Sequence, residues 1–244
     1  MTYLVEPAES LPGVGAWFTT RSAGNLSHRR PHLPARLARD RAAVMAAMGL
    51  AGTHLHLMQQ VHGAEVAEVT AETIVGAELR GVDALVTATP GRALAVQVAD
   101  CVPLLLASSA GPVAAVHVGR RGLVAGVVAA TLDALRRRSA PAGTLHAVLG
   151  PAIGGCCYEV PAALRDEVAA DVPQVAATTT WGTPSLDLPA AVRAQLATAG
   201  AEVAAAASPC TRCSGGDWFS HRRDGRAGRQ LGIVVRWPAL TGVG

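Results

Sequence analysis

Three short segments of this chain place a histidine or a cysteine where an apolar run meets a turn. They contain His62, the Asp100-Cys101 pair and His117. Functional groups commonly lie at such edges. His62, Cys101 and His117 form a borderline-soft ligand set, and three protein ligands with one open position are typical of a catalytic zinc site. Because these residues lie far apart in the sequence, composition and spacing alone favour three buried side chains with satisfied hydrogen bonds over a metal site.

The basic residues are all arginines, 21 in number, and the chain contains no lysine. This excludes an internal Schiff base, a pyridoxal phosphate anchor and a P-loop lysine. Any phosphate must be held by backbone N–H groups or by arginines, whose planar fork matches two oxygens at once. The net charge is only +3, and the Arg136–Arg138 run has no interleaved aromatic residues, so it indicates a solvated helix end and not a nucleic-acid surface.

The five cysteines are an odd number and are unevenly placed. The first residues lack the basic and apolar regions of a signal peptide, so we expect a cytoplasmic protein with reduced thiols. Cys156 and Cys157 are adjacent, and neighbouring cysteines are strained as a pair, which favours packing. Cys210 and Cys213 have CxxC spacing, but no βαβ context surrounds them and the sequence reveals no further ligands. Packing is therefore favoured over a redox or structural-metal role.

The elements that must position these residues alternate along the 244-residue chain, half of which is hydrophobic and 16% charged. The longest apolar stretch, 94–107, is interrupted by Gln97 and Asp100, which excludes a transmembrane span. Hydrophobic patterning predicts strands over 17–20, 54–61, 64–70, 83–87, 94–98, 103–107, 112–118, 145–149, 202–206 and 231–237. It predicts helices over 35–49, 122–138, 161–170 and 189–200. Some strand connections are too short for parallel crossovers, so we expect a mixed α/β or α+β fold with layered sheets in a single domain, residues 1–244.

Five motifs together resemble the YfiH-like family. They are QVHG at 60–63, ADCVPLLL at 99–106, AVHVGRRG at 115–122, LGPAIGGCCYEV at 149–160, and the pattern that runs from Cys210 through WFSHRRDG at 218–225 to GR at 228–229. Members of this family have been called polyphenol oxidases or laccase-like proteins, purine nucleoside phosphorylases and peptidoglycan editing factors. Two departures concern the pocket: Arg120 stands where the family usually has tryptophan, and the early loop at 24–31 is shorter.

The resemblance implies a layered single-domain fold in which His62, Cys101 and His117 bind zinc. It also implies cytoplasmic enzymes that phosphorolyse adenosine, inosine and S-methyl-5′-thioadenosine and deaminate adenosine. In deamination, zinc would activate a water for attack on C6 of adenine, with Asp100 as a candidate proton carrier or, equally, a supporting turn residue.

Phosphorolysis requires a grip on phosphate, for which Arg121, Arg222 and Arg223 are the candidates. Gln60 either orients His62 or contacts the base. The expected partners are thus purine nucleosides and phosphate, with no nucleic acid and no membrane, in a monomer or a small homo-oligomer.

Other functions remain open. Cys101 could act as a nucleophile with His117 as its base, in an amidase or other hydrolase that edits peptidoglycan precursors. Copper is an alternative metal, but a single His2Cys site lacks the several coppers that a four-electron phenol oxidase needs. A metal-binding module without catalysis would explain the three ligands but not the arginine-rich motifs.

Overall fold

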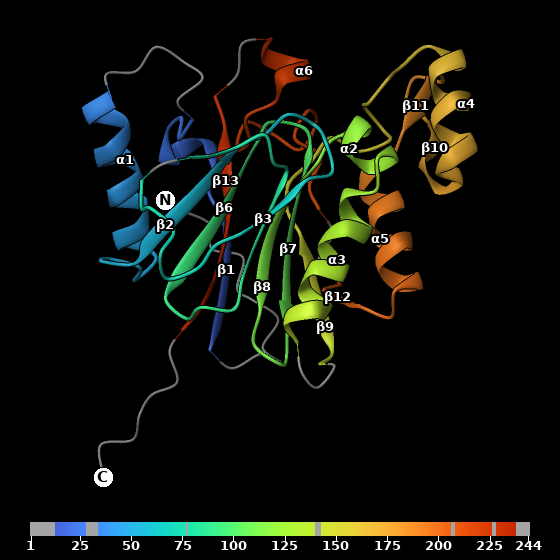
Figure 1. Ribbon diagram of the computed structural model, residues 1–244. Helices are drawn as coiled ribbons and strands as arrows, with labels where there is room; N and C mark the ends of the chain where they lie inside the picture. Colours follow the sequence, from blue (N-terminus) through green and yellow to red (C-terminus); the bar gives the residue numbers. More distant parts are fainter. Residues whose placement is uncertain are drawn as a thin grey trace.

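Two β-sheets pack face to face, and helices cover both outer faces (Figure 1). The computed structural model describes residues 13–27, 34–76, 78–139, 143–205, 208–225 and 228–237. The first sheet has the strand order β1 (Val14–Phe18), β13 (Gln230–Arg236), β6 (Arg92–Val98), β2 (His54–Gln59) and β4 (Glu78–Arg80). In this sheet β13 runs antiparallel to both neighbours, whereas β2 is parallel to β6 and β4, so the sheet is mixed.

The second sheet is also mixed and holds most of the buried apolar strands. Its order is β12 (Glu202–Val203), β9 (Leu145–Leu149), β7 (Val102–Ser108), β8 (Val113–Val118), β5 (Ala84–Thr87) and β3 (Val66–Glu68). The central strand β7 is antiparallel to β8 and β9, while the two edge pairs are parallel.

The helices are divided between the two outer faces (Figure 1). Helix α1 (Pro34–Ala47) covers the five-stranded sheet. On the six-stranded side lie α2 (Arg120–Val124), α3 (Val127–Arg138), α4 (Ala162–Asp171) and α5 (Leu188–Thr198). A small hairpin, β10 (Ala176–Thr178) with β11 (Pro184–Leu186), accompanies α4. Helix α6 (His221–Asp224) and 3₁₀ turns at Arg21–Ala23 and Pro173–Val175 complete the described elements.

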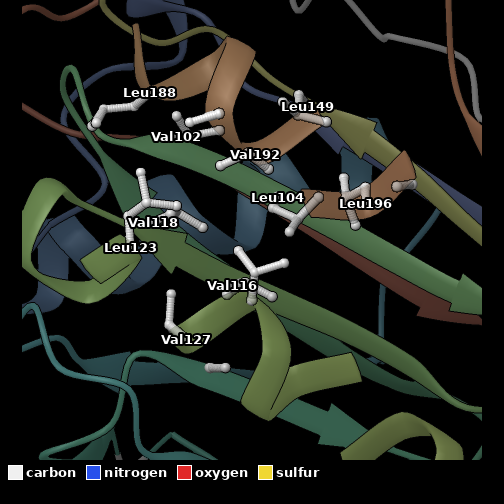
Figure 2. Close-up of a cluster of buried hydrophobic side chains, with 14 of the residues drawn as sticks. Val102, Leu104, Val116, Val118, Leu123, Val127, Leu149, Leu188, Val192 and Leu196 are labelled. Carbon is white, nitrogen blue, oxygen red and sulfur yellow. The ribbon is translucent and has the colours of Figure 1, made fainter. Parts of the chain in front are cut away.

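Because side chains alternate between the two faces of a strand, the two sheets bury three hydrophobic cores. One lies between the sheets, one between the five-stranded sheet and α1, and one between the six-stranded sheet and its helices. Along β6, Leu94 packs between the sheets while Ala93 faces α1. Along β7, Leu105 packs between the sheets while Leu104 faces the helices. Figure 2 shows the core between the six-stranded sheet and its helices, with Leu104 close to Val192 of α5. Burying a side chain of this size stabilises a fold by roughly 1.5–3 kcal/mol, so these layers hold the strand ends in fixed positions.

The mixed α/β fold with layered sheets confirms the fold class expected from the sequence. One prediction was wrong: a single helix was expected over 122–138, but Gly126 adopts a left-handed φ of 85° and separates α2 from α3. The short strands β4, β10 and β11 were not predicted. Residues 28–31 of the early loop lie outside the described ranges. None of the helices in those ranges combines the length and apolarity needed to cross a bilayer.

Candidate functional site

The structure brings His62, Cys101 and His117 together at one end of the two sheets. His62 follows β2 of the first sheet, His117 lies on β8 of the second, and Cys101 lies where the chain passes from β6 to β7. One ligand atom from each of the three lies within 4.8 Å of the others. Cys101 Sγ is 3.8 Å from His62 Nε2, and the two imidazole rings meet edge to face with centroids 4.7 Å apart.

The buried carboxylate of Asp83 holds two members of this cluster, His62 and His117, through hydrogen bonds. Its Oδ1 accepts hydrogen bonds from the backbone N–H of His62 at 2.9 Å and from His117 Nδ1 at 2.7 Å. Its Oδ2 accepts from the N–H groups of Val61 at 3.1 Å and Gly63 at 2.7 Å. Burial alone raises the pKa of Asp83, but the bonds from His117 and the backbone outweigh it and lower the pKa overall. The carboxylate therefore fixes the loop and orients His117 so that Nε2 is directed away from Asp83.

Two ligand-bearing turns adopt backbone conformations that L-residues rarely take. His62 has φ 63° and Asp100 has φ 93°, and they are the non-glycine residues of positive φ among those described. Such conformations cost of order 1–3 kcal/mol each and persist only where the surroundings impose them. For His62 the three N–H bonds to Asp83 impose it. One strained position is His62 itself and the other directly precedes Cys101, and strain of this kind clusters at active sites and ligand clamps.

The geometry and chemistry of the three side chains fit a zinc ion. With Zn–S near 2.3 Å and Zn–N near 2.0–2.1 Å, tetrahedral coordination separates the sulfur and nitrogen ligands by about 3.6 Å. The observed separation of Cys101 Sγ and His62 Nε2 is 3.8 Å. The ring nitrogen of a metal-binding histidine that does not bind the metal commonly donates a hydrogen bond to a carboxylate, as Nδ1 of His117 does to Asp83. Gly119 leaves the necessary space, because a Cβ there would lie 2.6 Å from His62 Cδ2 and 3.3 Å from Cys101 Sγ.

Without a metal, Cys101 and His117 polarise each other. Burial raises the pKa of Cys101, but the charge of His117 and hydrogen bonds from both histidines reverse this and lower the pKa to about 6. Burial lowers the pKa of His117, but the Cys101 thiolate and Asp83 outweigh it and raise the pKa to about 9. Near neutral pH, the metal-free pair is thus a Cys101 thiolate beside a protonated His117. Binding of a metal cation to this pair would release the proton from His117.

A cavity of about 400 Å³ opens over the cluster, a volume within the range of small-molecule sites. Among the residues that the structure describes, its polar lining includes four arginines and one carboxylate, that of Asp100. The residues that line it are Ser27, Met58, Gln60, His62, Gln97, Val98, Ala99, Asp100, Cys101, His117, Arg120, Arg121, Ile153, Tyr158, Leu188, His221, Arg222 and Arg229. The cavity therefore presents positive charge next to a metal-binding set.

Gln60 and Asp100 are both held firmly in this lining. Gln60 exchanges two hydrogen bonds with the backbone of Gln97, donating to its carbonyl at 2.8 Å and accepting from its N–H at 2.9 Å. Asp100 accepts from Thr211 Oγ1 and from the backbone N–H of Arg222, each at 2.6 Å. Asp100 thus ties the chain beside Cys101 to the segment that carries Arg222.

The arginines predicted for phosphate occupy different positions. Arg121 lies in the first turn of α2, and Arg222 lies in α6. Both line the cavity. The Arg222 guanidinium stacks on Tyr158, 5.1 Å from its ring centroid, and donates to the Glu159 carbonyl at 2.7 Å. Arg223 lies outside the lining, because its guanidinium donates to carbonyls of the loop before α6, those of Thr211, Gly215 and Trp218.

Sequence reasoning missed several members of the site. Tyr158, His221 and Arg229 line the cavity, and Asp83 accepts the hydrogen bond of His117, yet none of the four was among the predicted site residues. Tyr158 and His221 lie within the motifs that carry the family resemblance, which was the available signal. Arg229 ends the last of these motifs, as the arginine of its GR pair at 228–229, so the same signal was available for it.

Comparison with known proteins identifies the family. Residues 15–237 match the family described as "Multi-copper polyphenol oxidoreductase laccase". The chain is 46% identical over 202 residues to purine nucleoside phosphorylase ORF3 of Streptomyces griseus, with 82% of each chain covered. It is 35% identical over 247 residues to purine nucleoside phosphorylase YfiH of Shigella flexneri, covering 96% of this chain and 99% of that one.

Solved structures agree with this match. YlmD from Geobacillus stearothermophilus superposes with a TM-score of 0.82 at 29% identity, covering 95% of this chain and 94% of that one. Bacillus licheniformis YfiH gives a TM-score of 0.79 at 28% identity, covering 91% and 92%. The resemblance drawn from the motifs is thereby confirmed. The chain belongs to this laccase-like family, in which its relatives carry the names purine nucleoside phosphorylase and YfiH.

Proposed function

We propose that this protein is a zinc-dependent purine nucleoside phosphorylase that acts on adenosine, inosine and S-methyl-5′-thioadenosine and also deaminates adenosine. One observation carries the proposal: a cavity of about 400 Å³ places a His2Cys cluster and four arginines around the same space. The relatives' name, purine nucleoside phosphorylase, supports the phosphorolysis part of this proposal. The proposed substrates supply an uncharged base and sugar for the cavity and a phosphate anion for the arginines.

His62, Cys101 and His117 would hold the ion, leaving its fourth position open to the cavity. When bound there, zinc supplies Lewis-acid chemistry toward the substrate. Copper fits the family's description, but among the described residues only one candidate metal cluster contains histidine, and the other consists of four cysteines. A phenol oxidase that reduces oxygen by four electrons needs several coppers, so we favour zinc.

The arginines would bind phosphate. Arg120, Arg121, Arg222 and Arg229 all line the cavity, and a guanidinium can donate two parallel hydrogen bonds to phosphate oxygens. Stacking on Tyr158 and the bond to the Glu159 carbonyl hold the Arg222 side chain in one orientation, so little side-chain freedom is lost when the anion binds. Arg120, which replaces the tryptophan usual in the family, adds a further cation to this group.

The remaining residues would position these groups. The two bonds accepted by Asp100 support a role in holding the Arg222 segment. Each Asp100 oxygen accepts one of these bonds, which leaves each with a second lone pair that could take up a proton during deamination. The bonds of Gln60 to Gln97 leave it beside His62 as part of the cavity wall. Because the cavity draws residues from both sheets, we also propose that residues 1–244 act as one domain, as a monomer or a small homo-oligomer. Its thiolate ligands suit the reducing cytoplasm.

A product assay tests the proposal. Purified protein is incubated with inosine or adenosine, with and without phosphate, and the products are separated by chromatography. We expect free purine base and a sugar phosphate only when phosphate is present, and inosine from adenosine in either case. Base release that does not depend on phosphate, or no turnover of either nucleoside, would refute phosphorolysis by this site.

The electrostatics of Cys101 and His117 support a second candidate function. A thiolate with a pKa near 6 beside a protonated histidine is the arrangement of a cysteine hydrolase, for which peptidoglycan precursors are the candidate substrates. The two functions place opposite demands on Cys101, because a metal-bound thiolate is not free to attack a substrate.

A further inference from the structure

Four further cysteines form a second cluster, and one of them, Cys157, directly precedes Tyr158 of the cavity lining. Cys156, Cys157, Cys210 and Cys213 lie with their sulfur atoms all within 4.8 Å of one another. The sequence interpretation that the CxxC pair has no further ligands was therefore wrong. The adjacent Cys156-Cys157 pair supplies them from 53 or more residues away along the chain.

The spacing of these sulfur atoms matches a metal site and not a disulfide. Four thiolates at 2.3 Å from a tetrahedral zinc ion are separated from one another by about 3.8 Å. Cys156 Sγ and Cys213 Sγ are 3.8 Å apart. A disulfide would require about 2.05 Å, and all four residues carry free thiols. A set of four cysteines with no open position is typical of structural zinc.

The backbone around the cluster is arranged to receive negative charge. Cys210 Sγ lies 3.5 Å from the backbone N–H of Gly154, which donates to it. Arg212, inside the CxxC segment, donates to the Cys157 carbonyl at 3.2 Å and lies 4.8 Å from the centroid of the Trp181 ring. Four thiolates around a divalent cation carry two net negative charges, and this guanidinium partly offsets them.

The cluster also joins the two segments that build one side of the cavity. Ala152 and Cys210 form a parallel bridge, and Thr211, next to Cys210, donates to Asp100. Tyr158 follows Cys157 directly and stacks with Arg222. An ion held by all four sulfur atoms would therefore clamp the segment carrying Tyr158 to the segment carrying Arg222.

We propose that Cys156, Cys157, Cys210 and Cys213 bind one structural zinc ion as four thiolates. This site is separate from the His62-Cys101-His117 cluster, shares no ligand with it and does not depend on the proposed reaction.

Metal analysis of purified full-length protein tests the proposal. We expect about two zinc ions per chain in the wild type and about one in the double variant Cys156→Ser/Cys213→Ser. The control Ser214→Ala alters the same loop without removing a ligand, since the Ser214 hydroxyl only donates to the Cys210 carbonyl, and should keep both ions. Cys101→Ser should lose the other ion and keep this one. Loss of zinc from the Cys156/Cys213 variant but not from Cys101→Ser would support the cysteine site while refuting the metal part of the proposed function.

X-ray absorption at the zinc edge gives a readout that does not depend on the double variant folding. Zinc remaining in Cys101→Ser should have a first shell of sulfur alone, at about 2.3 Å. The proposal would be overturned by nitrogen in the first shell of the zinc in that protein. It would also be overturned by a wild type that binds a single zinc, at the His2Cys site. A Cys156–Cys213 disulfide in mass spectra of freshly purified protein would refute it as well.

Discussion

Replacing Asp83 with asparagine is the sharpest test of how the His2Cys cluster is built. The substitution preserves the shape of the side chain but turns one acceptor oxygen into an NH2 donor. Each carboxylate oxygen of Asp83 accepts two hydrogen bonds, and all four donors are N–H groups. In either orientation of the amide, therefore, two N–H donors lose their acceptor and face another donor.

The expected magnitude follows from these contacts. Asp83 is fully buried, and each unsatisfied buried donor costs about 1–3 kcal/mol, so the variant should lose roughly 2–6 kcal/mol of unfolding free energy. If the amide nitrogen replaces Oδ1, His117 Nδ1 must accept a hydrogen bond from the amide NH2 instead of donating one. Its own proton then resides on Nε2, the nitrogen needed for a metal. Loss of such a supporting carboxylate typically weakens metal binding about 10–100-fold, or about 1.4–2.7 kcal/mol.

Zinc affinity is measured by competition with a chromogenic chelator, with the Cys101→Ser protein as the baseline for zinc held elsewhere in the chain. Urea unfolding gives the stability, and near-ultraviolet circular dichroism checks that each protein is folded. Asp133→Asn is the matched control, because Asp133 is largely exposed on α3 and meets only Arg136, at 3.4 Å. It should change stability by less than about 0.5 kcal/mol. A folded Asp83→Asn protein that binds zinc within twofold of the wild type would refute the reasoning.

Three further substitutions test the site. Cys101→Ser should lose one zinc and all activity together, since serine is a poor zinc ligand; an inactive variant that keeps its full zinc content would instead identify Cys101 as a nucleophile. Gly119→Ala should lower zinc affinity about tenfold or more, because its Cβ would crowd His62 and the Cys101 sulfur, and chelator competition measures this. Arg222→Ala should raise the KM for phosphate about tenfold or more and change the KM for nucleoside less than about twofold. Arg165→Ala, on α4 and outside the cavity lining, is the control. Equal effects on both KM values would contradict a phosphate role for Arg222.

The strands that carry the site were predictable because their side chains alternate or form short apolar runs. Residues 103–107 and 112–118 were expected as strands, and β7 and β8 cover them. The polar interruptions at Asp100 and His117 then stood out against an apolar background. Local periodicity shows where a strand ends, so it pointed to ligands at the strand ends.

Long-range pairing could not be predicted in the same way. Asp83 meets His117 across 34 residues, and nothing in the Val82–Leu85 segment shows that its carboxylate accepts four hydrogen bonds. Cys156 and Cys213 are 57 residues apart, and adjacent cysteines resemble packing until the fold bridges Ala152 to Cys210. These contacts depend on which strands become neighbours, which one sequence does not reveal.

The position of β13 has a consequence for how the protein is made. Among the described strands, β1 hydrogen-bonds only with β13, which also separates it from β6. The ribosome synthesises β1 first, and β13 follows about 210 residues later, a delay of roughly 10–40 s at about 5–20 residues per second. During that interval Phe18 has no sheet to join, and the five-stranded sheet supporting His62 has a gap. A nascent chain that stops before Gln230 therefore leaves an unpaired apolar strand, which is a substrate for chaperones and proteases and a nucleus for aggregation.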